Sequence, residues 1–139
     1  MKLEVVTPQG QLVSSEIDAL TAPGALGEFG VLPGHIPFIS AIRPGVVRFQ
    51  HGHTEGVLAV GPGFLEVSAE GRVVLLTQQG IARSEIVVDE ARHDRDGAQK
   101  KLDHWEGSQD DPARASVEAE RDWAQAQLDA AGSTAPAAH

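Results

Sequence analysis

The sequence predicts a β + α fold, with an N-terminal antiparallel β-sandwich of about nine to ten strands over residues 1–86 and a C-terminal antiparallel helical hairpin over residues 87–129. Two observations predict this division. Of the 15 glycines, 12 precede Ser84, and they separate short β-type runs at roughly the 8–12-residue spacing typical of sandwiches. After Val88 the period of the apolar residues changes from that of a strand to that of a helix.

The strands of the sandwich are predicted from runs rich in β-branched and other apolar residues, separated by turn-forming sequences such as Arg43-Pro44-Gly45. These runs cover residues 3–7, 12–21, 28–32, 36–42, 46–50, 57–60, 64–68, 73–77 and 81–88. In the second run, alternation of period 2 places one face toward the core, consisting of Val13, Ser15, Ile17 and Ala19. Because the links are short, we expect the strands to meander antiparallel.

The two helices are predicted from apolar residues that recur on one face of each. The first seam consists of Ala91, Ala98, Leu102 and Trp105, and the second of Val117, Ala124 and Leu128. Asp89 is the expected N-cap of the first helix, and Asp111 that of the second, with Pro112 at its first position. Since residues 107–110 form a short link, the helices should lie antiparallel. Both seams are thin, so this hairpin should be marginal alone.

Composition restricts the function. The net charge is −9, and residues 84–139 carry 13 acidic and 6 basic side chains, so we expect no nucleic-acid partner. There is no cysteine, which excludes disulfides and Cys-based metal or redox chemistry. No apolar stretch is long enough for a signal peptide or a membrane span, so no direct membrane insertion is expected. Residues 130–139 are predicted to be a disordered tail.

A small metal-dependent, cupin-like sandwich enzyme is the alternative function. The first half of the cupin pattern is matched by Gly45, five intervening residues, and then His51, Gly52 and His53. Glu55 then follows too closely, and the chain has no asparagine for the second cupin motif. A turn exposed to solvent is the simpler interpretation, and we predict neither a metal site nor catalytic residues.

One long motif resembles a known family. The sequence Gly-Glu-Phe-Gly-Val-Leu-Pro-Gly-His-Ile-Pro at residues 27–37 is similar to the signature of the ε subunits of bacterial F-type ATP synthases. Residues 41–46, 59–67 and 88–92 are similar to further blocks of that family. The resemblance extends over about residues 1–128.

This resemblance implies a central-stalk subunit without a catalytic site of its own. The sandwich would dock on the γ subunit and the c-ring and couple proton flow through the c-ring to ATP synthesis in the head. Glu28, Val31 and His35 are the implied partner-contacting residues, with Glu28 toward the c-ring and His35 toward γ. The alternative is that these residues only shape the turn, a turn-scaffolding role in which the His35 side chain is hydrogen-bonded to main-chain carbonyls. The implied location is peripheral, on the cytoplasmic face of the bacterial inner membrane.

The hairpin of the family is a regulatory element that can extend toward the α and β subunits and inhibit ATP hydrolysis. The second helix offers only Arg114 and Arg121 as cations, so we expect weak inhibition. Asp89 and Arg92 match the start of an ATP-binding motif of some relatives and are candidate nucleotide-binding residues. Gln99, however, stands where a second arginine would be needed, so ATP is a doubtful regulatory ligand and no cofactor is expected. A simple i, i+3 helix pair is the alternative for Asp89 and Arg92.

Overall fold

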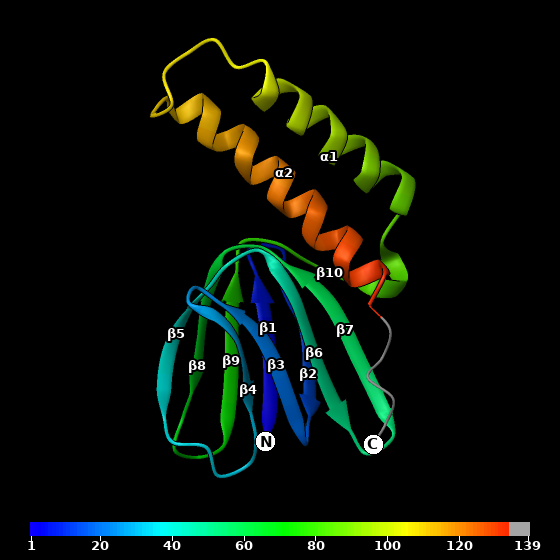
Figure 1. Ribbon diagram of the computed structural model, residues 1–139. Helices are drawn as coiled ribbons and strands as arrows, with labels where there is room; N and C mark the ends of the chain where they lie inside the picture. The colour runs from blue at the N-terminus through cyan, green and yellow to red at the C-terminus, as the bar shows by residue number, and fades with distance from the viewer. Residues whose placement is uncertain (134–139) are drawn as a thin grey trace.

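The computed structural model describes residues 1–133 and consists of a two-layered β-sandwich with a helical hairpin at one end (Figure 1). The described elements are β1 (Lys2–Thr7), β2 (Gly10–Glu16), β3 (Ala19–Gly24), β4 (Gly27–Val31), β5 (Phe38–Ile42), β6 (Gly45–His51), β7 (Thr54–Val60), β8 (Gly63–Val67), β9 (Arg72–Thr77), β10 (Gly80–Ala82), a 3₁₀ turn (Arg83–Glu85), α1 (Val88–Asp103) and α2 (Pro112–Ala131). The predicted sandwich followed by a hairpin is confirmed.

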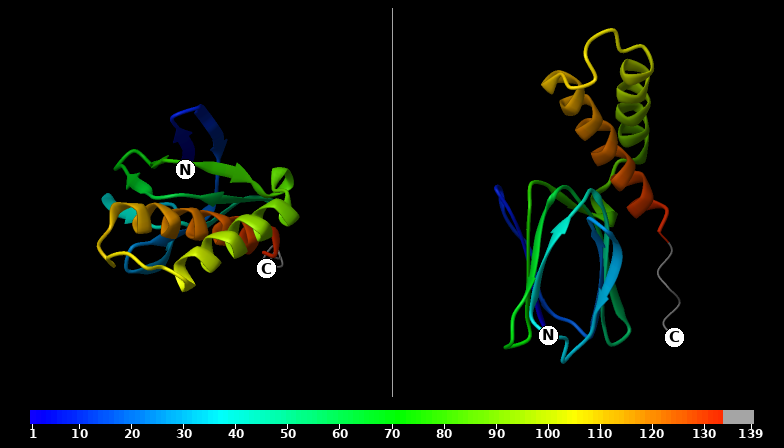
Figure 2. Two further views of the ribbon diagram at one scale, coloured as in Figure 1. Left: turned by 90° about the horizontal axis from the view of Figure 1, so that it is seen from above. Right: turned by 60° about the vertical axis from the view of Figure 1, so that its left-hand side comes forward.

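The ten strands form one hydrogen-bonded sheet in the order β10-β7-β6-β3-β5-β8-β9-β1-β2, with β4 added to β3. A single residue pair, Gly24 with Ile42, connects β3 to β5. At this pair the sheet folds over, so β5-β8-β9-β1-β2 form one layer and β4, β3, β6, β7 and β10 the other (Figure 2, right). The two layers enclose a core of branched aliphatic side chains that includes Leu3, Leu20, Val31, Leu65 and Leu75.

Three details of the predicted strands are wrong. The sheet is not a simple antiparallel meander, because β1 pairs parallel with β9 as well as antiparallel with β2. The predicted run 12–21 is two strands, since the chain bends at Asp18. This bend shifts the inward face by one residue, so Leu20 at 2% exposure, rather than Ala19, enters the core. The predicted run 81–88 contains only the end of β10 before the 3₁₀ turn begins.

The helix ends follow the predicted chemistry at α2 but not at α1. Asp111 caps α2 as expected, because its Oδ1 accepts a hydrogen bond from the N–H of Ala113 at 2.9 Å. The N-cap of α1 is Val87, without a side-chain bond, and Asp89 lies in the first turn. Trp105 lies beyond the end of α1, where its indole Nε1 donates to the carbonyl of Ser108 at 3.1 Å.

The hairpin is closed, and α2 lies between α1 and the sandwich (Figures 1 and 2). Of the predicted seams, Ala91, Ala98, Leu102 and Ala124 are buried. The structure adds a second buried face on α2, where Ala126 and Ala130 pack against Val57 and Ala59 of β7. The predicted disordered tail is wrong for Ala130 and Ala131, which belong to α2, and residues 134–139 lie outside the described part of the chain.

Candidate partner-binding surface

Glu28 and Val31, two of the predicted partner-contacting residues, lie on β4 but face opposite directions. The side chain of Glu28 is 58% exposed, and its Oε2 lies 3.8 Å from Nη1 of Arg48 on β6. Val31 is 0% exposed and belongs to the core. Its proposed contact role is therefore corrected: period-2 alternation within a short strand turns this residue inward while Glu28 turns outward.

His35 lies in the exposed loop of residues 32–37 between β4 and β5. Its N–H donates to the carbonyl of Leu32 at 3.1 Å, and its Nδ1 lies 2.9 Å from the carbonyl oxygen of Ile36. The imidazole also contacts the ring of Phe38, with 4.9 Å between ring centroids. These contacts fit the turn-scaffolding role, while the exposed ring remains available to a partner. Glu28 and His35 are not brought together, because they lie at opposite ends of β4.

The structure shows an apolar surface that the sequence analysis did not identify. Strand register places Ala41 beside Phe64, Phe64 beside Leu76, and Leu76 beside Val6, in a row across β5, β8, β9 and β1. Phe64 is 61% exposed and Leu76 is 55% exposed. We call these four residues, together with the 67% exposed Ile39 on β5, the apolar face.

An open groove of about 410 Å³ lies at one end of the apolar face, where Phe64 and Leu76 meet Pro8 and Pro62. Exposed apolar side chains that adjoin across several strands are typical of protein-interaction sites, whereas scattered ones are not. The sequence contains one signal for this surface, the continuous apolar run Val73-Val74-Leu75-Leu76. Such a run predicts a strand that is covered on both faces, one by the core and the other by a partner.

The two histidines of the metal-site alternative lie at the turn between β6 and β7. Both are exposed, and Gly52 between them adopts a φ of 59° in a tight turn. The N–H of Gly52 donates to Oδ2 of Asp18 at 2.6 Å, so the nearby carboxylate serves the turn itself. Within residues 1–133, no group of three or more His, Asp or Glu side chains is placed to hold a metal ion.

Asp89 and Arg92 form an exposed ion pair in the first turns of α1, with Nη1 of Arg92 3.1 Å from Oδ1 of Asp89. Neither residue lines the two grooves between the helices. This contact is the i, i+3 helix pair of the simpler interpretation, and nucleotide binding by Asp89 and Arg92 stays a prediction.

The fold defines a class of protein: a β-sandwich that carries a helical hairpin at one end and exposes an apolar face on one of its layers. The family described as the ATP synthase delta/epsilon chain β-sandwich domain matches residues 1–82. The chain belongs to the family of ATP synthase epsilon chains, which are non-catalytic stalk subunits of that complex. The resemblance seen in the sequence is thereby confirmed, and the metal-enzyme alternative has no support.

Relatives from several bacteria show this membership. The ATP synthase epsilon chain of Anaeromyxobacter sp. (strain K) is 41% identical over 102 residues, which are 73% of this chain and 76% of the relative. The epsilon chain of Magnetococcus marinus is 43% identical over 101 residues, 73% of each chain. That of Desulforamulus reducens is 37% identical over 116 residues, 84% of this chain and 86% of the relative.

Two solved structures share the fold. One is a chain of the Euglena gracilis mitochondrial ATP synthase, with a TM-score of 0.74 and 22% identity over 88% of this chain and 76% of that chain. The other is a chain of the central stalk and c-ring structure of the Tetrahymena thermophila mitochondrial enzyme, with a TM-score of 0.63 and 13% identity over 94% and 96%. No helix within residues 1–133 is long and apolar enough to cross a membrane.

Proposed function

We propose that this chain couples rotation of the c-ring to the catalytic head of a proton-translocating F-type ATP synthase, with the sandwich docked on γ and on the c-ring. The observation that carries this proposal is the apolar face, an exposed surface on a chain of the epsilon family. On that basis the apolar face contacts γ. Its burial would remove Phe64, Leu76 and Ile39 from water, which is the usual driving force of stable association.

We assign the two exposed contact residues, Glu28 and His35, to different partners. His35 lies in the loop of residues 32–37, which joins β4 to β5. Because β5 carries Ile39 of the apolar face, we assign this loop to γ as well. Glu28 lies at the other end of β4 and is assigned to the c-ring. The location that follows from these partners is peripheral, on the cytoplasmic face of the bacterial inner membrane.

The hairpin is assigned at most a weak inhibitory role through transient contact with α and β. Its two cations on α2 are already paired, since Arg114 lies 2.7 Å from Glu118 and Arg121 lies 3.1 Å from Asp122. Both pairs support the expectation of weak electrostatic attraction to an acidic surface, because a paired guanidinium presents less net charge.

The test is capture of the full chain by isolated γ subunit. Phe64→Glu should weaken binding by at least about tenfold, because a carboxylate would be buried in an apolar contact. Val87→Glu is the matched control: Val87 is 53% exposed at the N-cap of α1, in the hairpin and not on the strands of the apolar face, and its replacement should leave binding unchanged. Equal binding by Phe64→Glu and the unmodified chain would refute the assignment of this face to γ.

A further inference from the structure

An open groove of about 230 Å³ lies on the layer of the sandwich opposite the apolar face. Its lining includes Thr21 of β3, Arg48 and Gln50 of β6, and Glu55 of β7. Strand register places Thr21 directly opposite Arg48, and Gln50 directly opposite Glu55. Because the side chain of Leu20 enters the core, that of its neighbour Thr21 points to the outside of the layer. We call Thr21, Arg48, Gln50 and Glu55 the outer groove.

Two polar atoms of the outer groove are buried without a hydrogen-bond partner. Within residues 1–133, three buried side-chain atoms lack a partner, and two of them are Oγ1 of Thr21 and Oε1 of Glu55. The third, Nε of Arg114, lies on α2. A buried polar atom without a partner loses its hydration uncompensated, so such atoms in native proteins usually bind a protein group, water or a ligand. Two of them in one groove favour a ligand with hydrogen-bonding groups.

The outer groove also holds opposite charges that do not pair with each other. Within the described part of the chain no ion pair joins Arg48 to Glu55. The two are diagonal neighbours on β6 and β7, a relation that places residues roughly 7–8 Å apart. Nε of Arg48 donates to Oγ of Ser133 at 2.9 Å, and its Nη1 lies 3.8 Å from Oε2 of Glu28. A guanidinium carries five N–H donors, so these contacts leave donors for a ligand.

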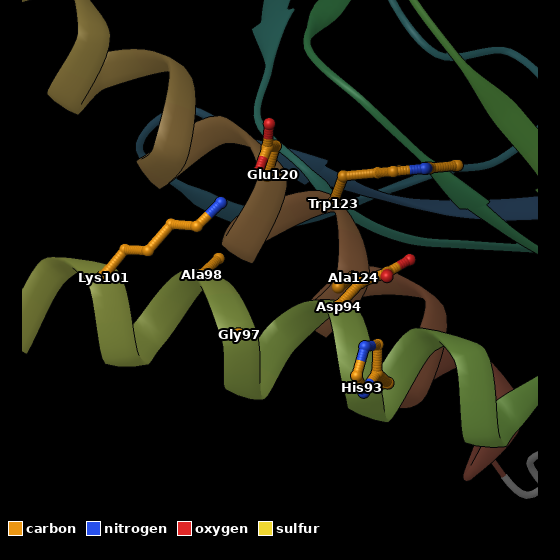
Figure 3. Close-up of a pocket in the computed structure, with 8 residues that line it drawn as sticks. All are labelled: His93, Asp94, Gly97, Ala98, Lys101, Glu120, Trp123 and Ala124. Carbon is orange, nitrogen blue, oxygen red and sulfur yellow. The ribbon is translucent and has the colours of Figure 1, made fainter.

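The larger groove between the two helices has mixed charge but no such unpartnered atoms (Figure 3). Its volume is about 500 Å³, and its lining includes Asp94, Lys101, Glu120 and Trp123. Within residues 1–133, no residue of that groove carries a buried side-chain atom without a hydrogen-bond partner. The outer groove is therefore the better candidate for a ligand, although it is smaller.

We propose that the outer groove binds a free α-amino acid with a small side chain. The ammonium group of the ligand donates hydrogen bonds to Oε1 of Glu55. Its carboxylate accepts hydrogen bonds from the guanidinium of Arg48 and from the hydroxyl of Thr21, which strand register places side by side. The volume of about 230 Å³ is below the roughly 300–1,000 Å³ of pockets for drug-sized ligands, so the groove suits a small molecule.

A zwitterion fits these charges better than an ion of one sign. A simple anion would pair with Arg48 but would leave Oε1 of Glu55 without a donor and add a like charge beside it. A simple amine would pair with Glu55 but would add a like charge beside the guanidinium. The inference goes beyond the proposed function. Because the outer groove and the apolar face belong to different layers, the amino acid and γ would not compete.

Titration of the isotope-labelled full-length chain with glycine, followed by the NMR shifts of its main-chain amides, tests this proposal. Saturable shifts should be concentrated at the outer groove. Methylamine and acetate each carry one of the two charged groups of glycine, and each should bind at least about tenfold more weakly. Absence of saturable shifts with glycine would overturn the proposal. Equal binding of acetate would show a simple anion site at Arg48 and would overturn it as well.

Two substitutions test the assigned contacts. Glu55→Gln keeps the shape of the side chain but removes its charge, so it should weaken glycine binding by at least about tenfold. Thr21→Val should also weaken binding without lowering the midpoint of urea denaturation, because a buried hydroxyl without a partner does not stabilise the fold. A lower midpoint would show that this hydroxyl serves the fold and would contradict its role as a ligand contact.

The matched control is Glu66→Gln on β8, which makes the same change in the other layer. It should bind glycine as the unmodified chain does. Glycine binding that is equal in Glu55→Gln and Glu66→Gln would refute the site. Capture by γ should be the same with and without glycine, so failure of this proposal and failure of the proposed function are distinguishable.

Discussion

Gly63, the first residue of β8, lies where two main chains approach most closely. A Cβ built there would overlap the carbonyl oxygen of Leu76 and would lie 2.8 Å from Cα of Thr77. The same corner holds the buried Thr77, whose hydroxyl lies 3.0 Å from the carbonyl oxygens of Gly61 and Gln79. Only glycine fits this corner, because neither neighbour is a side chain that could rotate away.

We therefore expect Gly63→Ala to lower the free energy of unfolding by about 3 kcal/mol, the upper part of the range for overpacking. Urea denaturation followed by circular dichroism would measure it. Gly30→Ala on β4 is the control, because its Cβ would lie an ordinary 3.7 Å from the nearest atom, the carbonyl oxygen of Leu20. A similar midpoint for both variants would contradict this account of the corner.

A second prediction concerns the charge of Glu28. In the assembled synthase, Glu28→Lys should weaken the association of this subunit with the c-ring by about 1 kcal/mol, or roughly fivefold, which is typical of an exposed charge contact. Proton-driven ATP synthesis in membrane vesicles would fall with it. Glu70→Lys, in the turn between β8 and β9, makes the same charge change away from β4. Unchanged assembly and synthesis with Glu28→Lys would remove this residue from the interface.

Single residues were predictable where local chemistry decides their position. Asp111 caps α2 because its short carboxylate reaches a free N–H, whereas Asp89 does not cap α1, since the chain already turns helical at Val88. Trp105 continues the apolar period of α1 in sequence, but the helix ends at Asp103 and the indole serves the link instead. Local pattern does not indicate where a helix stops when the next residues still fit its face.

At the scale of elements, α1 has a weak point at Gly97. Glycine in a helix interior costs conformational entropy, and here no atom lies within 4 Å of the missing Cβ. Gly97→Ala should therefore raise the free energy of unfolding of α1 by about 1 kcal/mol. Slower hydrogen exchange in residues 88–103, with unchanged exchange in the sandwich, would be the evidence. Faster exchange of α1 would show that Gly97 is needed for packing.

Strand existence was predictable from turns and apolar runs, but strand pairing was not. The parallel partner of β1 is β9, which is remote in sequence, and no local signal connects them. The apolar face depends on this pairing, because Val6 joins Leu76 only through it. Likewise, α2 packs on β7 through two small residues, Ala126 and Ala130. A sequence pattern based on large apolar side chains does not reveal this contact.

At the scale of the whole molecule, most of the negative charge lies in the hairpin. Residues 84–139 hold 13 of the 20 acidic side chains, and the arginines of α2 are paired within the helix. Removal of residues 89–139 should therefore change ATP hydrolysis by the reconstituted synthase only slightly. A phosphate-release assay would measure this, with γ capture of the truncated chain as the control for folding. A large rise in hydrolysis would instead show that the hairpin is a strong inhibitor.

The position of β1 between β9 and β2 has a consequence for biosynthesis. During synthesis β1 can pair with β2 as soon as both strands have been made, yet its other edge has no partner until β9, seven elements later in the chain than β2, has also been made. Until then a strand that carries Leu3 and Val5 keeps an unpaired edge and uncovered apolar side chains. The nascent chain is therefore most open to wrong pairing between strands during synthesis of the sandwich, and arrival of β9 closes that interval.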